Sequence, residues 1–116
     1  MNRTSANQLH VDNRQAWRTW LERHAADAAE VWVVLHKKGS GRQTISYDDL
    51  VEEALCFGWV DSMVRTLDAT RYVQRFTPRK PASKWSASNI ARVKRLEAAG
   101  QMTEAGLAAF DKRDRG

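Results

Sequence analysis

The hydrophobic pattern of the chain changes its period at Gly58, near the middle of the sequence. Before Gly58, apolar residues in "ISYDDLVEEALCF" recur at helical spacing, and Ser46 carries a side chain that can cap the first turn. After Gly58 the period is two, in two runs, residues 59–67 and 71–77, which are separated by "DAT". Because so short a connection can join only antiparallel strands, the pattern predicts a helix that leads directly into an antiparallel hairpin.

The segments on either side of this unit predict further elements. Apolar residues at helical spacing predict a first helix up to about residue 25, and "EVWVVLHKK" has the length and composition of a strand. Two more helices are predicted after the hairpin, one ending at Gly100 and one capped by Thr103. The order helix, strand, helix, strand, strand, helix, helix predicts an α+β domain, with helices packed on a small, mostly antiparallel sheet.

Length and composition indicate one domain. A chain of 116 residues with 42% hydrophobic residues has the size and apolar content of a single core. We expect this domain to span residues 12–110, between a flexible N-terminus (1–11) and a flexible C-terminal tail (111–116). No apolar run reaches the roughly 18 residues of a membrane span, and the first residues lack the apolar stretch of a secretory signal. A cytoplasmic location is therefore expected.

The sequence contains no recognisable catalytic arrangement. Its three histidines are far apart, and none neighbours a serine or the single cysteine, Cys56, which is predicted to be a small buried apolar residue. We see no phosphate-binding glycine pattern and no zinc-ligand spacing, so no cofactor or metal is predicted and an enzyme is not favoured. One face of a predicted helix carries four carboxylates, Asp48, Asp49, Glu52 and Glu53. They could hold a hard cation weakly, but an ordinary exposed helix face is the favoured interpretation.

The positive charge of the chain is concentrated in one region. Residues 65–95 hold nine Lys or Arg and one Asp, whereas the segments before and after them are net negative. Such a local field attracts anionic partners. Within it, "RFTPRKPASKWSASN" adds two stiffening prolines and aromatic surfaces on which a base could stack. The residues predicted to bind a polyanion, nucleic acid foremost, are Arg65, Arg71, Arg75, Arg79, Lys80, Lys84 and Trp85.

Two other hypotheses stay open. One is a site for a small anion or a peptide, with or without catalysis, lined by Trp59, Asp61, Arg75 and Arg79. The candidate residues of such a pocket are Trp59, Asp61, Phe76, Ser86 and Asn89. Asp61 has structural alternatives, because it could instead cap neighbouring backbone or pair with a basic residue. The other hypothesis is a module that binds a protein partner.

Four short segments resemble a known family. "EALCFGW", "RFTPRKP", "WSASN" and "GQMTEAG", within roughly residues 14–110, closely resemble the YdeI/OmpD-associated family of bacteria, also labelled bacteriocin-protection proteins. The resemblance implies a fold related to YjbR and frataxin-like (CyaY-like) α+β domains. It also implies DNA binding on a basic surface, as in YjbR-like relatives, or a role in tolerance of antimicrobial peptides. It implies no catalytic residue. Similar proteins usually continue past "AAF" into a second basic segment, whereas this sequence ends at Gly116.

Overall fold

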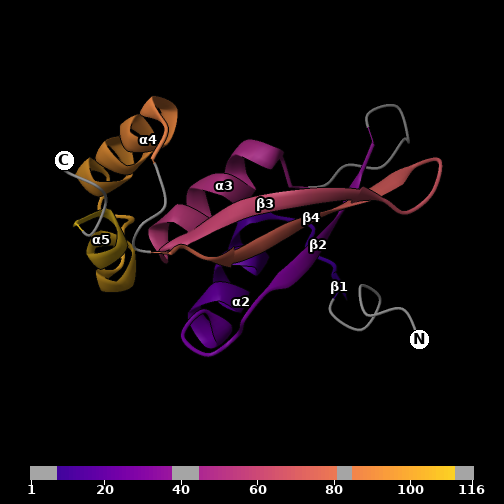
Figure 1. Ribbon diagram of the computed structural model, residues 1–116, viewed down its shortest axis with the longest axis horizontal. Helices are drawn as coiled ribbons and strands as arrows, with labels where there is room; N and C mark the ends of the chain where they lie inside the picture. Colours follow the sequence, from indigo (N-terminus) through magenta and orange to yellow (C-terminus); the bar gives the residue numbers. More distant parts are fainter. Residues whose placement is uncertain (1–7, 38–44, 81–84, 112–116) are drawn as a thin grey trace.

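The structure is a computed structural model that describes residues 8–37, 45–80 and 85–111. Its elements in chain order (Figure 1) are β1 (Gln8–Leu9), α2 (Arg14–His24), β2 (Val31–His36), α3 (Tyr47–Cys56), β3 (Trp59–Thr66), β4 (Arg71–Pro78), α4 (Ala87–Ala98) and α5 (Glu104–Asp111). The predicted α+β class and the predicted order of elements are confirmed, with one short strand added at the start. No helix within the described ranges is long and apolar enough to cross a membrane.

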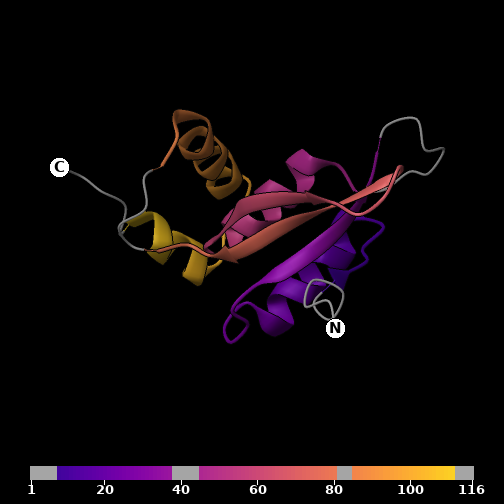
Figure 2. The same ribbon diagram turned by 45° about the vertical axis from the view of Figure 1, so that its right-hand side comes forward.

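The four strands form one sheet in the order β1-β2-β4-β3. Strand β4 pairs antiparallel with both β2 and β3, whereas β1 pairs parallel with β2. The register between β3 and β4 shifts between Asp61 and Val64, a bulge at the sheet edge. Figures 1 and 2 both place α4 and α5 beside the end of the sheet where β3 starts, while the β3–β4 turn extends away from them.

Strand β1 was not predicted. Gln8 pairs with Trp32, Leu9 pairs with Val33, and Val11 is buried in the main core. The segment is polar and the strand has only two residues, so it offers no period that the sequence could reveal. Residues 8–11 therefore belong to the folded domain rather than to a separate flexible segment.

Local sequence explains where the helices begin and end. The Ser46 side chain accepts a hydrogen bond from the Asp49 amide at 3.1 Å, which confirms the predicted cap of α3. Asn13 and Ser86 cap α2 and α4 in the same way. Gly58 ends α3 with a φ of 78°, a left-handed conformation that favours glycine and lets the chain turn directly into β3.

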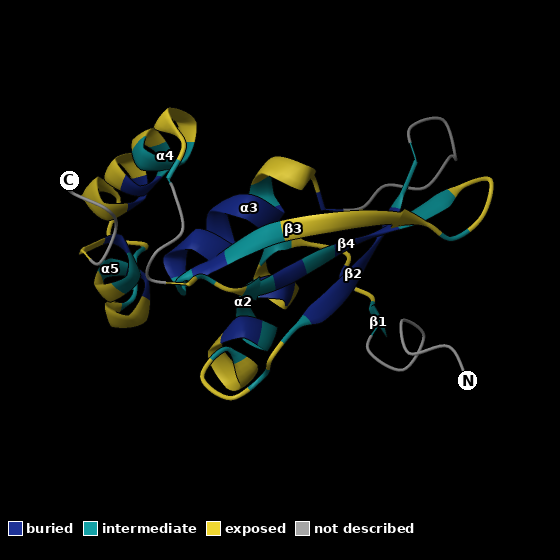
Figure 3. Cartoon of the chain, viewed as in Figure 1, coloured by how far each residue is buried: buried dark blue, intermediate teal, exposed yellow. Residues whose placement is uncertain are grey.

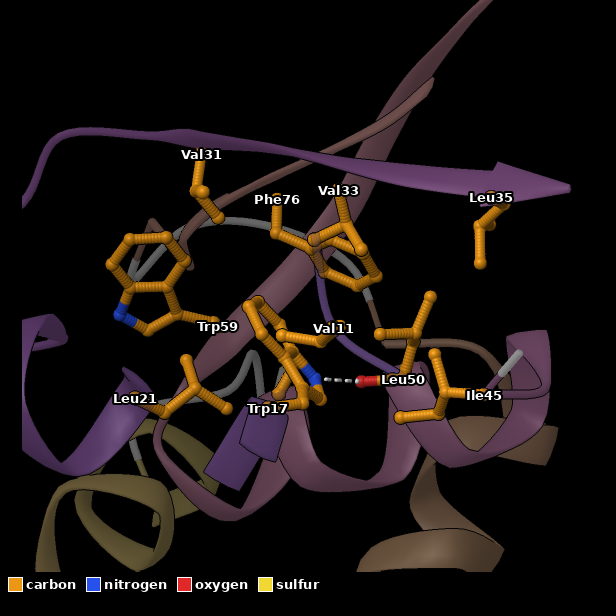
Figure 4. Packing of buried hydrophobic residues seen from close by; sticks show 11 residues of the cluster. Val11, Trp17, Leu21, Val31, Val33, Leu35, Ile45, Leu50, Trp59 and Phe76 are labelled. Atoms are coloured by element: carbon orange, nitrogen blue, oxygen red, sulfur yellow. Dashed lines mark hydrogen bonds between the residues drawn. The ribbon is translucent and has the colours of Figure 1, made fainter. Parts of the chain in front are cut away.

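The α3 helix lies at the centre of the molecule. Figure 3 shows it largely buried, in contrast to most of β3. One face joins the main core under the sheet, where Trp17 donates its Nε1 hydrogen to the Leu50 carbonyl at 2.9 Å and packs against Phe76 (Figure 4). The other face packs against α4 and α5 through a second cluster of Val51, Leu55, Cys56, Val93, Leu96 and Phe110. A third, smaller cluster lies on the opposite face of the sheet: Trp32, Val34 and Val73.

Candidate functional site

The residues predicted to bind a polyanion lie in two separate places. Arg71 and Arg75 alternate with buried Val73 along β4, and Arg65 lies opposite Val73 on β3. These three arginines therefore share the sheet face that the main core does not occupy, which we call the outer face. Arg79 and Lys80 instead follow the end of β4, away from the hairpin turn. Lys84 lies outside the described residues.

Each arginine of the outer face interacts with another protein group. The Arg71 Nη2 atom lies 2.7 Å from the Asp68 Oδ2 atom, and the hydrogen bond from Arg71 holds the pKa of the Asp68 carboxyl at about 2. The Arg75 Nε atom donates to Glu30 Oε1 at 2.6 Å. The Arg65 guanidinium lies 5.4 Å from the centre of the Trp32 ring. Two ion pairs thus offset much of the charge that the sequence places in this region.

The acidic face of α3 lies between arginines of α2 and α4. Glu53 is buried and accepts hydrogen bonds from both Arg14 and Arg18, the latter at 2.8 Å. From the other side, α4 contributes the pairs Arg92–Asp48 and Arg95–Glu52. The prediction of an ordinary exposed face is therefore wrong for Glu52 and Glu53, which are 8% and 2% exposed, whereas Asp48 is exposed. No cluster of metal-ligating side chains occurs among the residues that the structure describes.

A pocket of about 200 Å³ lies between the end of α2, the start of β3 and helix α5. One wall consists of small residues of α5, Ala105, Ala108 and Ala109. Arg79 and Lys80 bring two positive charges to this otherwise mostly apolar lining. We call it the Arg79 pocket.

Arg79 is held in place by backbone and ring contacts. Its amide donates to the Gly58 carbonyl at 2.9 Å, and its guanidinium carbon lies 3.9 Å from the centre of the Trp85 ring. Trp85 in turn packs edge-on against Phe110 of α5. Burial lowers the pKa of the Arg79 guanidinium, while the negative charge of Asp61 raises it. The result is a positioned, partly desolvated guanidinium beside the pocket.

Two of the residues predicted for a small-ligand site, Trp59 and Arg79, line this pocket. Trp59 is also a core residue, 1% exposed, whose Nε1 donates to the Ala25 carbonyl at 3.2 Å. Asp61 lies apart from the lining and accepts a hydrogen bond from the Tyr47 hydroxyl at 2.5 Å. Arg75 lies on the outer face, so the structure does not bring the four predicted residues together.

The other three candidate pocket residues have structural roles. Phe76 is fully buried in the main core. Ser86 caps α4 by accepting from the Asn89 amide at 3.1 Å, and the Asn89 Oδ1 atom accepts from Arg92 at 3.2 Å. None of the three lines the Arg79 pocket.

Sequence reasoning missed the alanine wall of the pocket. Helix α5 lies close to the end of α3 because Gly106 has no side chain, and a Cβ atom there would lie 2.2 Å from the Cys56 carbonyl oxygen. That oxygen also accepts a hydrogen bond from the Thr103 hydroxyl at 2.5 Å. The small residues of "EAGLAAF" were the available signal, since alanine and glycine on a short helix permit close approach.

A second pocket, of about 370 Å³, adjoins the first. The two pockets share Ala25, Phe57 and Ala105 in their linings. The lining of the second pocket includes two carboxylates, Glu22 of α2 and Glu104 of α5. We call it the Glu104 pocket.

Comparisons with curated proteins and with solved structures found no significant match. The YdeI/OmpD-associated resemblance and the relation to YjbR and CyaY-like domains therefore stay predictions. A protein-family profile, described as "Domain of unknown function (DUF8412)", matches residues 9–109. Because this match covers most of the sequence and every helix and strand except the ends of β1 and α5, the chain belongs to the DUF8412 family.

Proposed function

We propose that the protein binds a small organic anion, a carboxylate or a phosphate ester, in the Arg79 pocket. The observation that carries this proposal is the placement of the Arg79 guanidinium, which is stacked on Trp85 and lines, together with Lys80, a pocket whose other described side chains are apolar. The volume of about 200 Å³ is below the ~300–1,000 Å³ of sites for drug-sized ligands, which favours a small molecule.

The chemistry of the lining suits an anion with a short apolar body. A guanidinium presents paired donors that match the oxygens of a carboxylate or phosphate, and stacking on an aromatic ring fixes its plane. Burial strengthens the attraction, because the effective dielectric constant is lower than in water. The alanines of α5 offer an apolar surface beside it. Among the described lining residues only Arg79 and Lys80 are titratable, so we propose binding rather than catalysis.

Tryptophan fluorescence offers a direct test, since Trp59 lines the pocket and Trp85 stacks on Arg79. Titration with linear monocarboxylates and with simple phosphate esters should change the emission of the wild-type protein. Arg79→Ala should weaken binding at least about tenfold, because a hydrogen bond to a charged group contributes roughly 1.5–3 kcal/mol. Arg65→Ala is the matched control, since Arg65 also stacks on a tryptophan but lies on the outer face. Equal losses in the two variants, or no binding of any of these anions, would contradict the proposal.

The outer face supports a second candidate function, binding of a polyanion such as nucleic acid. The observation that favours it is that Arg65, Arg71 and Arg75 lie on one face of two neighbouring strands. If each contacted one phosphate of duplex DNA, the log–log dependence of affinity on salt would have a slope of about −3. Binding of labelled duplexes at several salt concentrations, with Arg65→Ala and Arg79→Ala compared, tests it. Binding that does not respond to Arg65→Ala would reject this face.

A further inference from the structure

We infer that the ligand is a linear zwitterion that spans both pockets. Its anionic end lies in the Arg79 pocket and its cationic end lies in the Glu104 pocket. The inference rests on the proposed function and names its ligand class. Two pockets that share Ala25, Phe57 and Ala105 carry opposite charges, Arg79 with Lys80 in one and Glu22 with Glu104 in the other. A ligand that fills both must therefore be anionic at one end and cationic at the other.

The shared middle of the two pockets is apolar. Phe57 contributes an aromatic ring, and Ala25 and Ala105 contribute single methyl groups from α2 and α5. The described lining of the Glu104 pocket adds further apolar surface from Leu21 and Ala26. A methylene chain fits this surface, because burying each methylene group is favourable by about 0.8 kcal/mol.

The acidic end has charge available for a ligand. Glu104 is exposed, and its carboxylate makes no hydrogen bond or ion pair with any residue that the structure describes. The Glu22 side chain is 54% exposed, and its carboxylate lies 3.9 Å from the Arg18 Nε atom, at the limit of an ion pair. Arg18 meanwhile donates at shorter range, to Glu53 at 2.8 Å and to the Gln101 carbonyl at 3.2 Å. Arg18 therefore leaves much of the Glu22 charge for another cation.

Structural roles explain only part of this arrangement. Glu104 lies in the first turn of α5, where a carboxylate is favourable next to the helix dipole. Glu22 stands four residues after Arg18 on α2, the spacing of a helical ion pair. Neither role requires the two carboxylates to line the same apolar pocket. Their convergence next to a pocket of opposite charge is what points to a ligand with two charged ends.

The experiment uses three matched series of increasing chain length: linear ω-amino carboxylates, monocarboxylates and alkylamines. Binding to the full chain is measured by calorimetry. At the best length, the amino carboxylate should bind about fivefold tighter than the monocarboxylate of equal length, as expected for one partly exposed ion pair. A Glu22→Gln/Glu104→Gln double variant should remove this advantage, while monocarboxylates still bind, somewhat more tightly because two nearby negative charges are gone. Glu97→Gln, an exposed carboxylate of α4, is the matched control and should change neither.

The outcomes separate this inference from the proposed function. If monocarboxylates bind and lose affinity in Arg79→Ala, but an added amino group improves binding at no chain length, the zwitterion is rejected and the anion site stands. The zwitterion is also rejected, and the anion site stands, if the amino group improves binding equally in the wild type and in the double variant. If no series binds, the zwitterion is rejected together with the carboxylate as the ligand of the Arg79 pocket, and the titration with phosphate esters decides whether the pocket binds an anion.

Discussion

Gly106 sets how closely α5 approaches α3, and so where the alanine wall of the Arg79 pocket lies. A Cβ atom added there would meet backbone, with the Cys56 carbonyl oxygen at 2.2 Å. Backbone cannot move aside as a flexible side chain can, so Gly106→Ala should cost more than about 3 kcal/mol of unfolding free energy. Denaturant unfolding measures this change.

Gly100→Ala is the control for this substitution. Gly100 follows the end of α4, with a φ of 75° and no atom within 4 Å of an added Cβ. Alanine there should cost only about 1–2 kcal/mol, the price of a left-handed conformation. Equal losses in the two variants would contradict the close packing of α5 against α3.

Tyr47 should ionise at a higher pH than an ordinary tyrosine. Burial, together with the hydrogen bond to Asp61, raises the pKa of Tyr47 to about 12. Because the unfolded chain releases this proton near pH 10, the contribution of Tyr47 to stability should be constant below that pH and should be lost between about pH 10 and 12. Tyrosinate absorbance of the wild type against Tyr47→Phe reports this pKa. Asp61→Asn should lower it, and an unchanged value would contradict the pairing.

At the scale of elements, two arginines of α2 stabilise the buried Glu53 carboxylate of α3. The Glu53 carboxylate is 2% exposed, and Arg18→Ala would remove one of its two arginine partners. Breaking a buried pair costs roughly 3–5 kcal/mol, and since Arg14 remains, we expect a loss of about 2–3 kcal/mol. Arg23→Ala, an exposed arginine on the same helix, should change stability by less than about 0.5 kcal/mol. Thermal unfolding compares the variants, and equal effects would contradict the network.

The elements themselves were predictable where a period or a cap marks them. The Ser46 cap, the stop at Gly58 and the period-two hairpin each follow from local chemistry and each is confirmed. Strand β1 was not predictable, because a two-residue strand forms only when β2 is already there to pair with it. The burial of Glu53 was equally hidden, since its partners belong to another helix and lie 35 and 39 residues away in sequence.

At the scale of the whole molecule, Cys56 reports global unfolding. It is fully buried between α3, α4 and α5, and burial raises the pKa of its thiol to about 11. The reactive thiolate is therefore scarce and shielded in the folded state. Alkylation under native conditions should be slow and should follow the unfolded fraction as denaturant is added. Rapid alkylation of the folded protein would contradict this packing.

Charge shows most clearly what a linear sequence leaves out. Residues 65–95 look uniformly basic, yet Arg92 and Arg95 pair with α3, and Arg71 and Arg75 pair with nearby carboxylates. The chain thus converts much of this excess into ion pairs, two of which join α4 to α3. Arg79 was predicted as a binding residue. The pocket beside Arg79 was not predictable, because its wall consists of α5 alanines that only tertiary packing brings there.

Amide chemical-shift mapping with a linear monocarboxylate tests the central claim most directly. The account predicts that the largest shifts fall on the lining of the Arg79 pocket, at Gly58, Lys80 and Ala109, and that they are much smaller in Arg79→Ala at the same ligand concentration. Shifts that instead centre on Arg65 and Val73 of the outer face, or that persist in Arg79→Ala, would contradict it.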